Sequence, residues 1–284
     1  MSNLPFFYAL ENGEFARRGL KIELLPPMLQ APDIVAAVLG GQADGALDTA
    51  LLSIIQADQR DPGVLRVVLW TIASKDNAFM RIVVPVKSNI HSLNDLRGRR
   101  LGHFPSPQLR AICWAIAKRI GAAADAITLQ PTPPTAVIEA LAAGEIDAAL
   151  VLEPTGTIAI ERGIARSLTD SPVVDLAHDE IPIGAFSLSG AFCTDHPEDA
   201  RLYVEALEAG VALLRANPRS APGLIAKYTA AKNPDTAAKV TYPRHWLRRE
   251  AIADHFDYFM NLLRESGVEV PKLAASDLAY QDQE

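Results

Sequence analysis

Apolar and polar positions follow two different periods along the first eighty-eight residues, and the periods alternate. Helical spacing of apolar residues ends at glycines that are natural helix stops, Gly19 and the pair Gly40–Gly41. Alternating or continuous apolar runs rich in β-branched residues lie between these segments and are typical of strands. The pattern predicts helices at residues 5–19, 31–42 and 48–57, and strands at residues 20–27, 43–48, 65–74 and 80–88.

The same alternation starts again at residue 101 and changes character after residue 183. It predicts strands at residues 101–105, 126–133 and 147–154, and helices at residues 106–121 and 134–145. It then predicts a strand at 184–192, a long amphipathic helix at 196–218 and three more helical runs within 218–267. Helices that alternate with strands over short connections indicate an α/β fold in which parallel strands are covered by helices.

A short stretch of sequence occurs twice at a constant offset. Residues 38–47 read VLGGQADGAL and residues 141–150 read LAAGEIDAAL, so Gly41 and Gly144, like Asp44 and Asp147, lie 103 positions apart. In each copy the glycine would end a helix and the aspartate would begin the turn into a buried strand. We therefore expect one structural unit to be used twice, with both aspartates in the scaffold and away from any ligand.

Composition narrows the class of protein. A chain of 284 residues with 49% hydrophobic and 21% charged residues is long enough for two folded domains. The net charge of −7 and the scattered Lys and Arg residues argue against a nucleic-acid partner. Two distant cysteines and six histidines without ligand spacing predict neither a metal site nor a disulfide. Motifs for a nucleophile elbow, a phosphate loop or a dinucleotide fold are absent, so we expect no cofactor and no catalysis.

Candidate binding residues follow the predicted strands. In parallel α/β sheets, ligands bind beyond the carboxyl ends of the strands, where helix N-termini present free N–H groups. Helix capping alone would explain any single one of these side chains, but polar residues occupy corresponding positions in both halves of the chain. The rule selects Asp48, Thr49, Ser74, Ser106, Gln108, Thr132, Glu153 and Thr155.

The order of motifs resembles that of one family of binding proteins. FFYALENGEFARRGLKIEL, AAVLGGQADGAL, SLNDLRGRRLG and IEALAAGEIDAALVLEP, followed by a long helix ending in RANP, cover nearly the whole chain. Together they resemble the solute-binding proteins of ABC importers in the nitrate, taurine and alkanesulfonate group, which includes thiamine-pyrimidine synthase-like proteins. The resemblance implies a two-lobed α/β fold of the type II periplasmic-binding-protein class, in which two strands form a hinge between mostly parallel sheets. It also adds Asn3 and Phe6, from the opening loop SNLPFFYAL, to the candidate site.

The chain differs from the family pattern in two features, both at its start. Such proteins open with an export signal and with a strand that leads into the loop SNLPFFYAL, whereas this chain starts at that loop. Either the start is trimmed, or the first lobe lacks a central strand and has a gap in its sheet. We favour trimming, which implies a periplasmic or membrane-associated extracellular protein; an untrimmed chain would be cytoplasmic.

The resemblance predicts lobe one at residues 1–84 plus 186–284 and lobe two at residues 85–185. The expected function is capture of a small organic molecule in the cleft between the lobes, by a monomer that delivers it to an ABC permease. A cytosolic enzyme on the same fold, for cofactor biosynthesis or desulfination, is the alternative, and a ligand-sensing regulatory module is a third. A sulfonate-like anion would suit helix N-termini with Arg110 or Lys75. An aromatic heterocycle would suit Phe6, Phe7, Phe104 and Trp70, although their apolar neighbours favour core positions.

Overall fold

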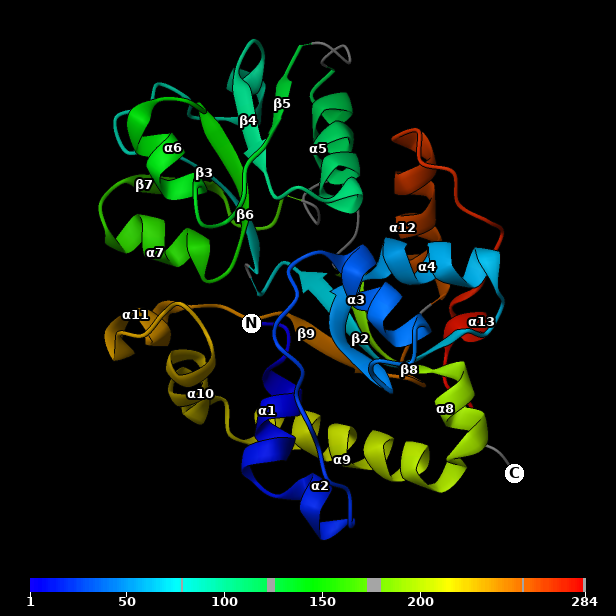
Figure 1. The fold of residues 1–284 in the computed structure, drawn as a ribbon. Coiled ribbons are helices and arrows are strands. Elements are labelled where there is room, and N and C mark those ends of the chain that lie inside the picture. Colours follow the sequence, from blue (N-terminus) through cyan, green and yellow to red (C-terminus); the bar gives the residue numbers. More distant parts are fainter. Residues whose placement is uncertain (78, 122–125, 173–179, 252, 283–284) are drawn as a thin grey trace.

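The chain forms two lobes, each built around one β-sheet (Figure 1). A computed structural model describes residues 1–77, 79–121, 126–172, 180–251 and 253–282. The strands are β1 (Gly45–Ala50), β2 (Leu65–Ser74), β3 (Met80–Pro85), β4 (Arg100–His103), β5 (Thr128–Pro131), β6 (Ala148–Leu152), β7 (Ala165–Thr169), β8 (Glu180–Ser189) and β9 (Arg244–Leu247).

Helices cover both sheets and form most of the last hundred residues. The first half contains α1 (Leu4–Glu11), α2 (Glu14–Arg17), α3 (Ala31–Leu39), α4 (Leu51–Arg60), the 3-10 turn η1 (Leu93–Leu96), α5 (Pro107–Arg119) and α6 (Val137–Ala143). The second half contains α7 (Thr155–Glu161), α8 (Gly190–Asp195), α9 (Pro197–Ala216), η3 (Pro218–Ser220), α10 (Ala221–Tyr228), α11 (Pro234–Lys239), α12 (Ala253–Glu265) and α13 (Ala275–Leu278). No helix in the described part of the chain is both long and apolar enough to cross a bilayer.

The sheet of lobe one has the strand order β1-β8-β2-β9, and each neighbouring pair in it is antiparallel. This differs from the mostly parallel sheet expected for this lobe. Because β1 and β2 are both antiparallel to β8, they run parallel to each other, as a β-α-β unit with α4 requires. The returning strand β8 lies between them, and sequence periodicity could not show that insertion.

The sheet of lobe two has the order β5-β4-β6-β3-β7 and contains the parallel unit that the sequence predicts. Strand β4 pairs in parallel with β5 and β6, whereas β3 pairs antiparallel with β6 and β7. The helices α5 and α6 connect the three parallel strands. The expected alternation of helix and strand over residues 101–154 is therefore present.

The chain passes between the two sheets twice. The first crossing lies between Ser74, the last residue of β2, and Met80, the first residue of β3. The second lies between Thr169 and Glu180. Both crossings precede the expected boundaries at 84/85 and 185/186, because β3 pairs with lobe-two strands and the whole of β8 pairs with lobe-one strands.

Two expected elements at the start of the chain differ from the structure. Residues 20–30 contain neither helix nor strand, and the strand predicted at 20–27 is wrong because no neighbouring strand pairs with it. Asp48 and Thr49, expected to cap a helix, belong to β1, and α4 starts only at Leu51. The continued pairing of β1 with β8 through Ala50 keeps these two residues extended.

A broad groove lies beside the outer edge of β1. It has a volume of about 1110 Å³ and is bounded by residues 19–28 on one side and residues 42–48 on the other. Strand β1 is at the end of its sheet and has no second partner strand among the described residues. Leu24, Leu25 and Leu29 are exposed in the segment on the far side.

The repeated stretch has the structural role that the sequence predicts. Gly41 and Gly144 follow α3 and α6 with φ values of 69° and 70°, in the left-handed region that glycine adopts at helix ends. The Asp147 carboxylate accepts hydrogen bonds from the backbone N–H of Arg100, at 2.8 Å, and from its guanidinium. Asp147 thus ties the start of β6 to the start of β4.

One large apolar core extends through both lobes. It includes Trp70 of β2, Ile82 of β3, Ile112 of α5 and Phe259 of α12, all fully buried. Helix α12 packs against α5 of lobe two, and the Ser266 hydroxyl just after α12 donates to the Ala111 carbonyl at 2.9 Å. The C-terminal helices therefore connect the lobes at a second place, apart from the two crossings (Figure 1).

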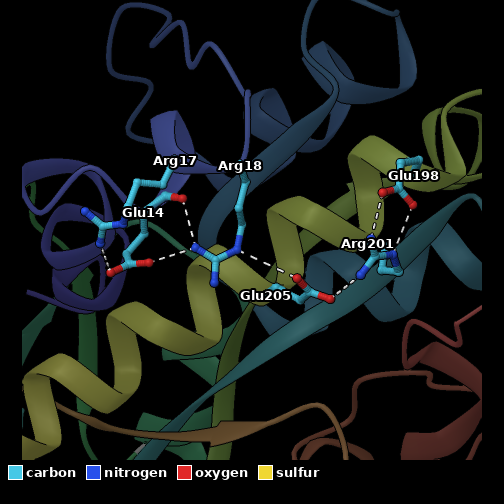
Figure 2. Close-up of polar contacts among 6 residues, drawn as sticks. All are labelled: Glu14, Arg17, Arg18, Glu198, Arg201 and Glu205. Carbon is cyan, nitrogen blue, oxygen red and sulfur yellow. Dashed lines mark hydrogen bonds and ion pairs between the residues drawn. The ribbon is translucent and has the colours of Figure 1, made fainter.

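An ion-pair network ties α2 to the long helix α9 on the outside of lobe one (Figure 2). Glu14 pairs with Arg17 and Arg18, and Arg18 reaches Glu205 of α9 at 3.7 Å. Glu205 also pairs with Arg201 in the same helix. Exposed pairs of this kind contribute about 0–1 kcal/mol each, so the network positions α2 more than it stabilises the fold.

Candidate functional site

A cleft of about 430 Å³ opens between the two lobes, and its size lies within the range of small-molecule sites. Lobe one contributes residues at the end of β1 and the start of α4, together with Ile183 and Gly184 of β8. Lobe two contributes the end of β6, the first turn of α5 and the first residue of α7. Seven of the ten candidate residues line the cleft, namely Asp48, Thr49, Ser106, Gln108, Thr132, Glu153 and Thr155.

Asp48 presents a half-buried carboxylate to the cleft. Its Oδ1 accepts a hydrogen bond from the Thr71 hydroxyl, and its backbone N–H donates to Asn3 Oδ1 at 3.0 Å. Burial raises the pKa of Asp48, and hydrogen bonds from Ser2 and Thr71 oppose that rise. Gly184 packs directly against this carboxylate, where a Cβ atom would lie 2.5 Å from Oδ1.

Gln108 bridges the two lobes instead of presenting a free amide. Its Nε2 donates to the Ile183 carbonyl of β8 at 2.7 Å, and its Oε1 accepts from the Leu52 N–H of α4 at 2.9 Å. The side chain is buried at the start of α5. Gln108 therefore lines the cleft, while both polar atoms of its side chain already hold lobe-one backbone groups.

Glu153 forms a buried ion pair at the floor of lobe two. Its Oε1 lies 2.8 Å from Arg81 Nε, and its Oε2 accepts from the Thr157 N–H at 3.2 Å in the first turn of α7. Burial raises the pKa of Glu153, while the Arg81 charge and the bonds from Thr157 oppose the rise. Arg81 also lies 3.6 Å from Asp170, so two carboxylates share this guanidinium.

The hydroxyl residues of the cleft have different local settings. Thr49 and Thr132 donate to backbone carbonyls two residues earlier, Leu47 and Gln130. Ser106 is the residue before α5, but its side chain makes no capping bond. These hydroxyls lie at the lining of the cleft with lone pairs available for a ligand.

Three candidate residues do not line the cleft. Phe6 is buried against Phe15 in the core beneath α1, at a centroid distance of 5.3 Å, and Asn3 lies beside the outer groove while it supports Asp48. Ser74 ends β2 and is buried behind the cleft. The possible anion partners Lys75 and Arg110 are exposed and lie outside the lining.

The sequence reasoning missed Arg81 and several apolar walls. Arg81 is the single charge in the apolar strand MRIVVP, and that isolation was a readable signal of a buried ion pair. Phe79 and Met80 line the cleft from the first crossing, and Phe104 lines it from the end of β4. Of the aromatic residues considered for the ligand, Phe104 is in the lining, whereas Trp70 is in the core.

The chemistry that the described lining residues offer is hydrogen bonding and apolar contact. The lining includes no cysteine, histidine, lysine or arginine. Within the described residues, no three His, Cys, Asp or Glu side chains are grouped to hold a metal ion. Both cysteines, Cys113 and Cys193, are buried elsewhere, and burial raises their pKa values, that of Cys193 to about 11.

Comparison with known proteins supports this geometry. A family model described as NMT1/THI5 like matches residues 2–221. A search of curated protein sequences finds no match. Among solved structures, the alkanesulfonate-binding protein SsuA from Xanthomonas axonopodis pv. citri, bound to MOPS, is similar with a TM-score of 0.75 and 17% identity over 98% of this chain and 95% of that one.

Two further structures share the fold. The periplasmic aliphatic sulphonate binding protein SsuA from Escherichia coli has a TM-score of 0.77 and 17% identity over 99% of this chain and 90% of that one. The desulfurization enzyme DSZB has a TM-score of 0.68 and 14% identity over 97% of this chain and 92% of that one. The type II periplasmic-binding-protein fold predicted from the sequence is confirmed, and at these identities the likeness extends to the fold alone.

Proposed function

The chain belongs to the NMT1/THI5-like family, and we propose that it is the solute-binding component of an ABC import system. The observation that carries this proposal is the 430 Å³ cleft, whose lining residues come from both lobes. A ligand in such a cleft contacts both lobes at once, so binding and lobe closure are coupled. The residues proposed to hold the ligand are those of the cleft lining, with Asp48, Thr49, Ser106, Glu153 and Thr155 as its polar contacts.

Binding is favoured over catalysis by the residues at the cleft. The desulfurization enzyme shows that the fold can host chemistry, and a cysteine-to-serine mutant of that enzyme has been solved in complex with biphenyl-2-sulfinic acid. In this chain both cysteines are buried away from the cleft. The described lining offers no thiol, imidazole or amine as a nucleophile or base. Its two carboxylates have contacts that suit ligand recognition.

The proposal has consequences for partners and compartment. A solute-binding component presents its loaded, closed form to an ABC permease and works outside the cytoplasmic membrane. The Escherichia coli relative is described as periplasmic, which agrees with this placement. We propose that this chain acts as a monomer, because one copy supplies both walls of the cleft.

A thermal-shift screen over small organic solutes tests the function. A solute at one hundred times its dissociation constant stabilises the folded protein by about 2.7 kcal/mol, which raises the melting temperature measurably. Small-angle scattering of the parent with a saturating hit should show compaction. A radius of gyration that stays constant at saturation would contradict binding between two closing lobes.

Two alanine variants locate the binding site. Thr49→Ala and Ser106→Ala should each weaken a hit by about 0.5–1.5 kcal/mol if a neutral hydrogen bond is lost, measured by calorimetry. Thr194→Ala is the matched control, because Thr194 is exposed on α8 and its hydroxyl also donates to a backbone carbonyl. Equal affinities in all three variants would place the ligand elsewhere.

A further inference from the structure

We propose that the cleft selects a neutral or positively charged solute with hydrogen-bond donors, such as an amine, amidine or ring N–H compound, over sulfonates and other anions. This inference rests on the proposed function and specifies its class of ligand. It differs from the sulfonate ligands named for the two SsuA structures. The charges, hydrogen bonds and lining of the cleft support it.

The first support is the charge of the cleft wall. Asp48 and Glu153 belong to the lining from opposite lobes, and the described lining includes no lysine, arginine or histidine. The Glu153 side chain is fully buried and paired with Arg81, so Asp48 carries the unpaired charge of the described wall. The Asp48 side chain accepts hydrogen bonds from neutral hydroxyls, those of Ser2 and Thr71. An anion placed beside Asp48 would meet like charge in a partly desolvated space, whereas a donor or a cation would be stabilised there.

One basic group near the cleft is already committed. Arg81 pairs with Glu153 at 2.8 Å and with Asp170 at 3.6 Å, so its charge is balanced before a ligand arrives. An anionic ligand would have to displace a carboxylate from Arg81 to gain a counter-charge.

At two of the helix starts that line the cleft, those of α4 and α7, an oxygen atom of the protein itself binds a backbone N–H group. Gln108 Oε1 accepts from the Leu52 N–H in the first turn of α4. Glu153 Oε2 accepts from the Thr157 N–H in the first turn of α7. These are the N–H groups that would otherwise attract a sulfonate or carboxylate. Among the described lining residues, the starts of α3 and α5, which have no side-chain cap, remain for an acceptor atom of the ligand.

The remaining lining suits a flat apolar body. Phe79, Phe104 and Met80 lie on one part of the wall, and Ile183 lies on the lobe-one side. A ring compound could place its faces against these side chains, its donors toward Asp48, and one acceptor toward the start of α5. The half charge at one helix start is smaller than the full charge of Asp48, so it does not reverse the preference.

Matched pairs of probes test the preference directly. Each pair shares one skeleton and differs in its polar group: benzylamine with phenylmethanesulfonate, 2-phenylethylamine with 2-phenylethanesulfonate, and benzamidine with benzoate. Thermal shifts at millimolar concentration and calorimetric titrations are measured at pH 7. The nitrogen member of each pair should bind at least about tenfold more tightly, because one charge-assisted hydrogen bond is worth that factor or more.

Charge-removing variants link the preference to the two acids. Asp48→Asn should weaken amine binding by about ten- to a hundredfold and leave sulfonate binding equal or stronger. Glu153→Gln removes the buried counter-charge of Arg81 and should strengthen sulfonate binding relative to amine binding. Asp44→Asn removes an exposed acid outside the cleft and should change neither. Circular dichroism establishes which variants fold, and Asp48→Asn remains informative if Glu153→Gln removes the buried partner of Arg81 and fails to fold.

The outcomes separate this inference from the function on which it rests. The ligand class would be overturned if the sulfonate or carboxylate members bind more tightly and if a substitution in the cleft, such as Ser106→Ala, abolishes that binding. The solute-binding function would then still stand. Equal binding in the parent and in both charge-removing variants would also overturn the ligand class. If no member of any pair, and no solute of the wider screen, binds the folded protein, the proposed function fails as well.

Discussion

Replacing Gln108 with leucine should destabilise the protein by about 2–4 kcal/mol, although leucine has a similar size. The side chain makes two buried hydrogen bonds across the lobes, to the Leu52 N–H at 2.9 Å and to the Ile183 carbonyl at 2.7 Å. Leu52 is the second residue of α4, so its N–H has no partner within the helix. Gln108→Leu leaves this donor and the carbonyl buried without partners, at about 1–3 kcal/mol each, and added apolar contact offsets part of that cost.

Urea unfolding at pH 7, followed by circular dichroism, measures this loss. Gln59→Leu is the matched control, because Gln59 is exposed on α4 and its replacement should change the free energy of unfolding by less than about 0.5 kcal/mol. Amide hydrogen exchange adds a local readout, since the Leu52 N–H should lose protection only in Gln108→Leu. The bridging role of Gln108 is refuted if the two variants unfold with the same free energy and Leu52 keeps its protection.

Three further predictions concern pH, packing and thiol chemistry. Burial lowers the pKa of His245 to about 3 although its Nε2 donates to the Ser2 carbonyl at 2.8 Å, so its protonation favours the unfolded state. The free energy of unfolding should therefore fall as pH drops from about 6.5 toward 3, by up to about 1.4 kcal/mol per pH unit from this residue. In denaturant titrations, His245→Gln should flatten that slope, and the exposed control His196→Gln should not. Gly210→Ala would force a Cβ atom against the Pro5 carbonyl and should lower the free energy of unfolding by about 1–3 kcal/mol. Gly223 lies in α10 with open space around it, so Gly223→Ala should raise the free energy of unfolding by about 0.5–1 kcal/mol in the same assay. Both buried cysteine thiols should resist a disulfide reagent until the protein unfolds, and rapid labelling of the folded protein would contradict this expectation. A chelator or a reductant should leave ligand affinity unchanged in calorimetry, and a loss of affinity would contradict the expected absence of a metal or redox site.

The sequence by itself determined the class of fold and most of its elements. Periodicity and glycine stops found the helices α3, α5 and α9 and the strands β2, β4 and β6, because those signals are local. The 103-residue repeat identified the turn that ends α3 and α6, since a left-handed glycine is needed wherever a helix ends in this way. The rule that ligands bind beyond strand ends selected eight candidates, and seven of them line one cleft.

Only the tertiary structure decided how those elements pair and which polar groups are free. The insertion of β8 between β1 and β2 depends on contacts between residues more than one hundred positions apart, and no local period encodes them. The same pairing keeps Asp48 in a strand, where a helix cap was expected. Gln108 and Glu153 have the sequence signature of ligand contacts, but the fold uses Gln108 to join the lobes and pairs Glu153 with Arg81. The net charge of the cleft is the sum of the charges of side chains that come from distant segments. The proposed ligand preference therefore depends on the folded structure, and local sequence patterns do not reveal it.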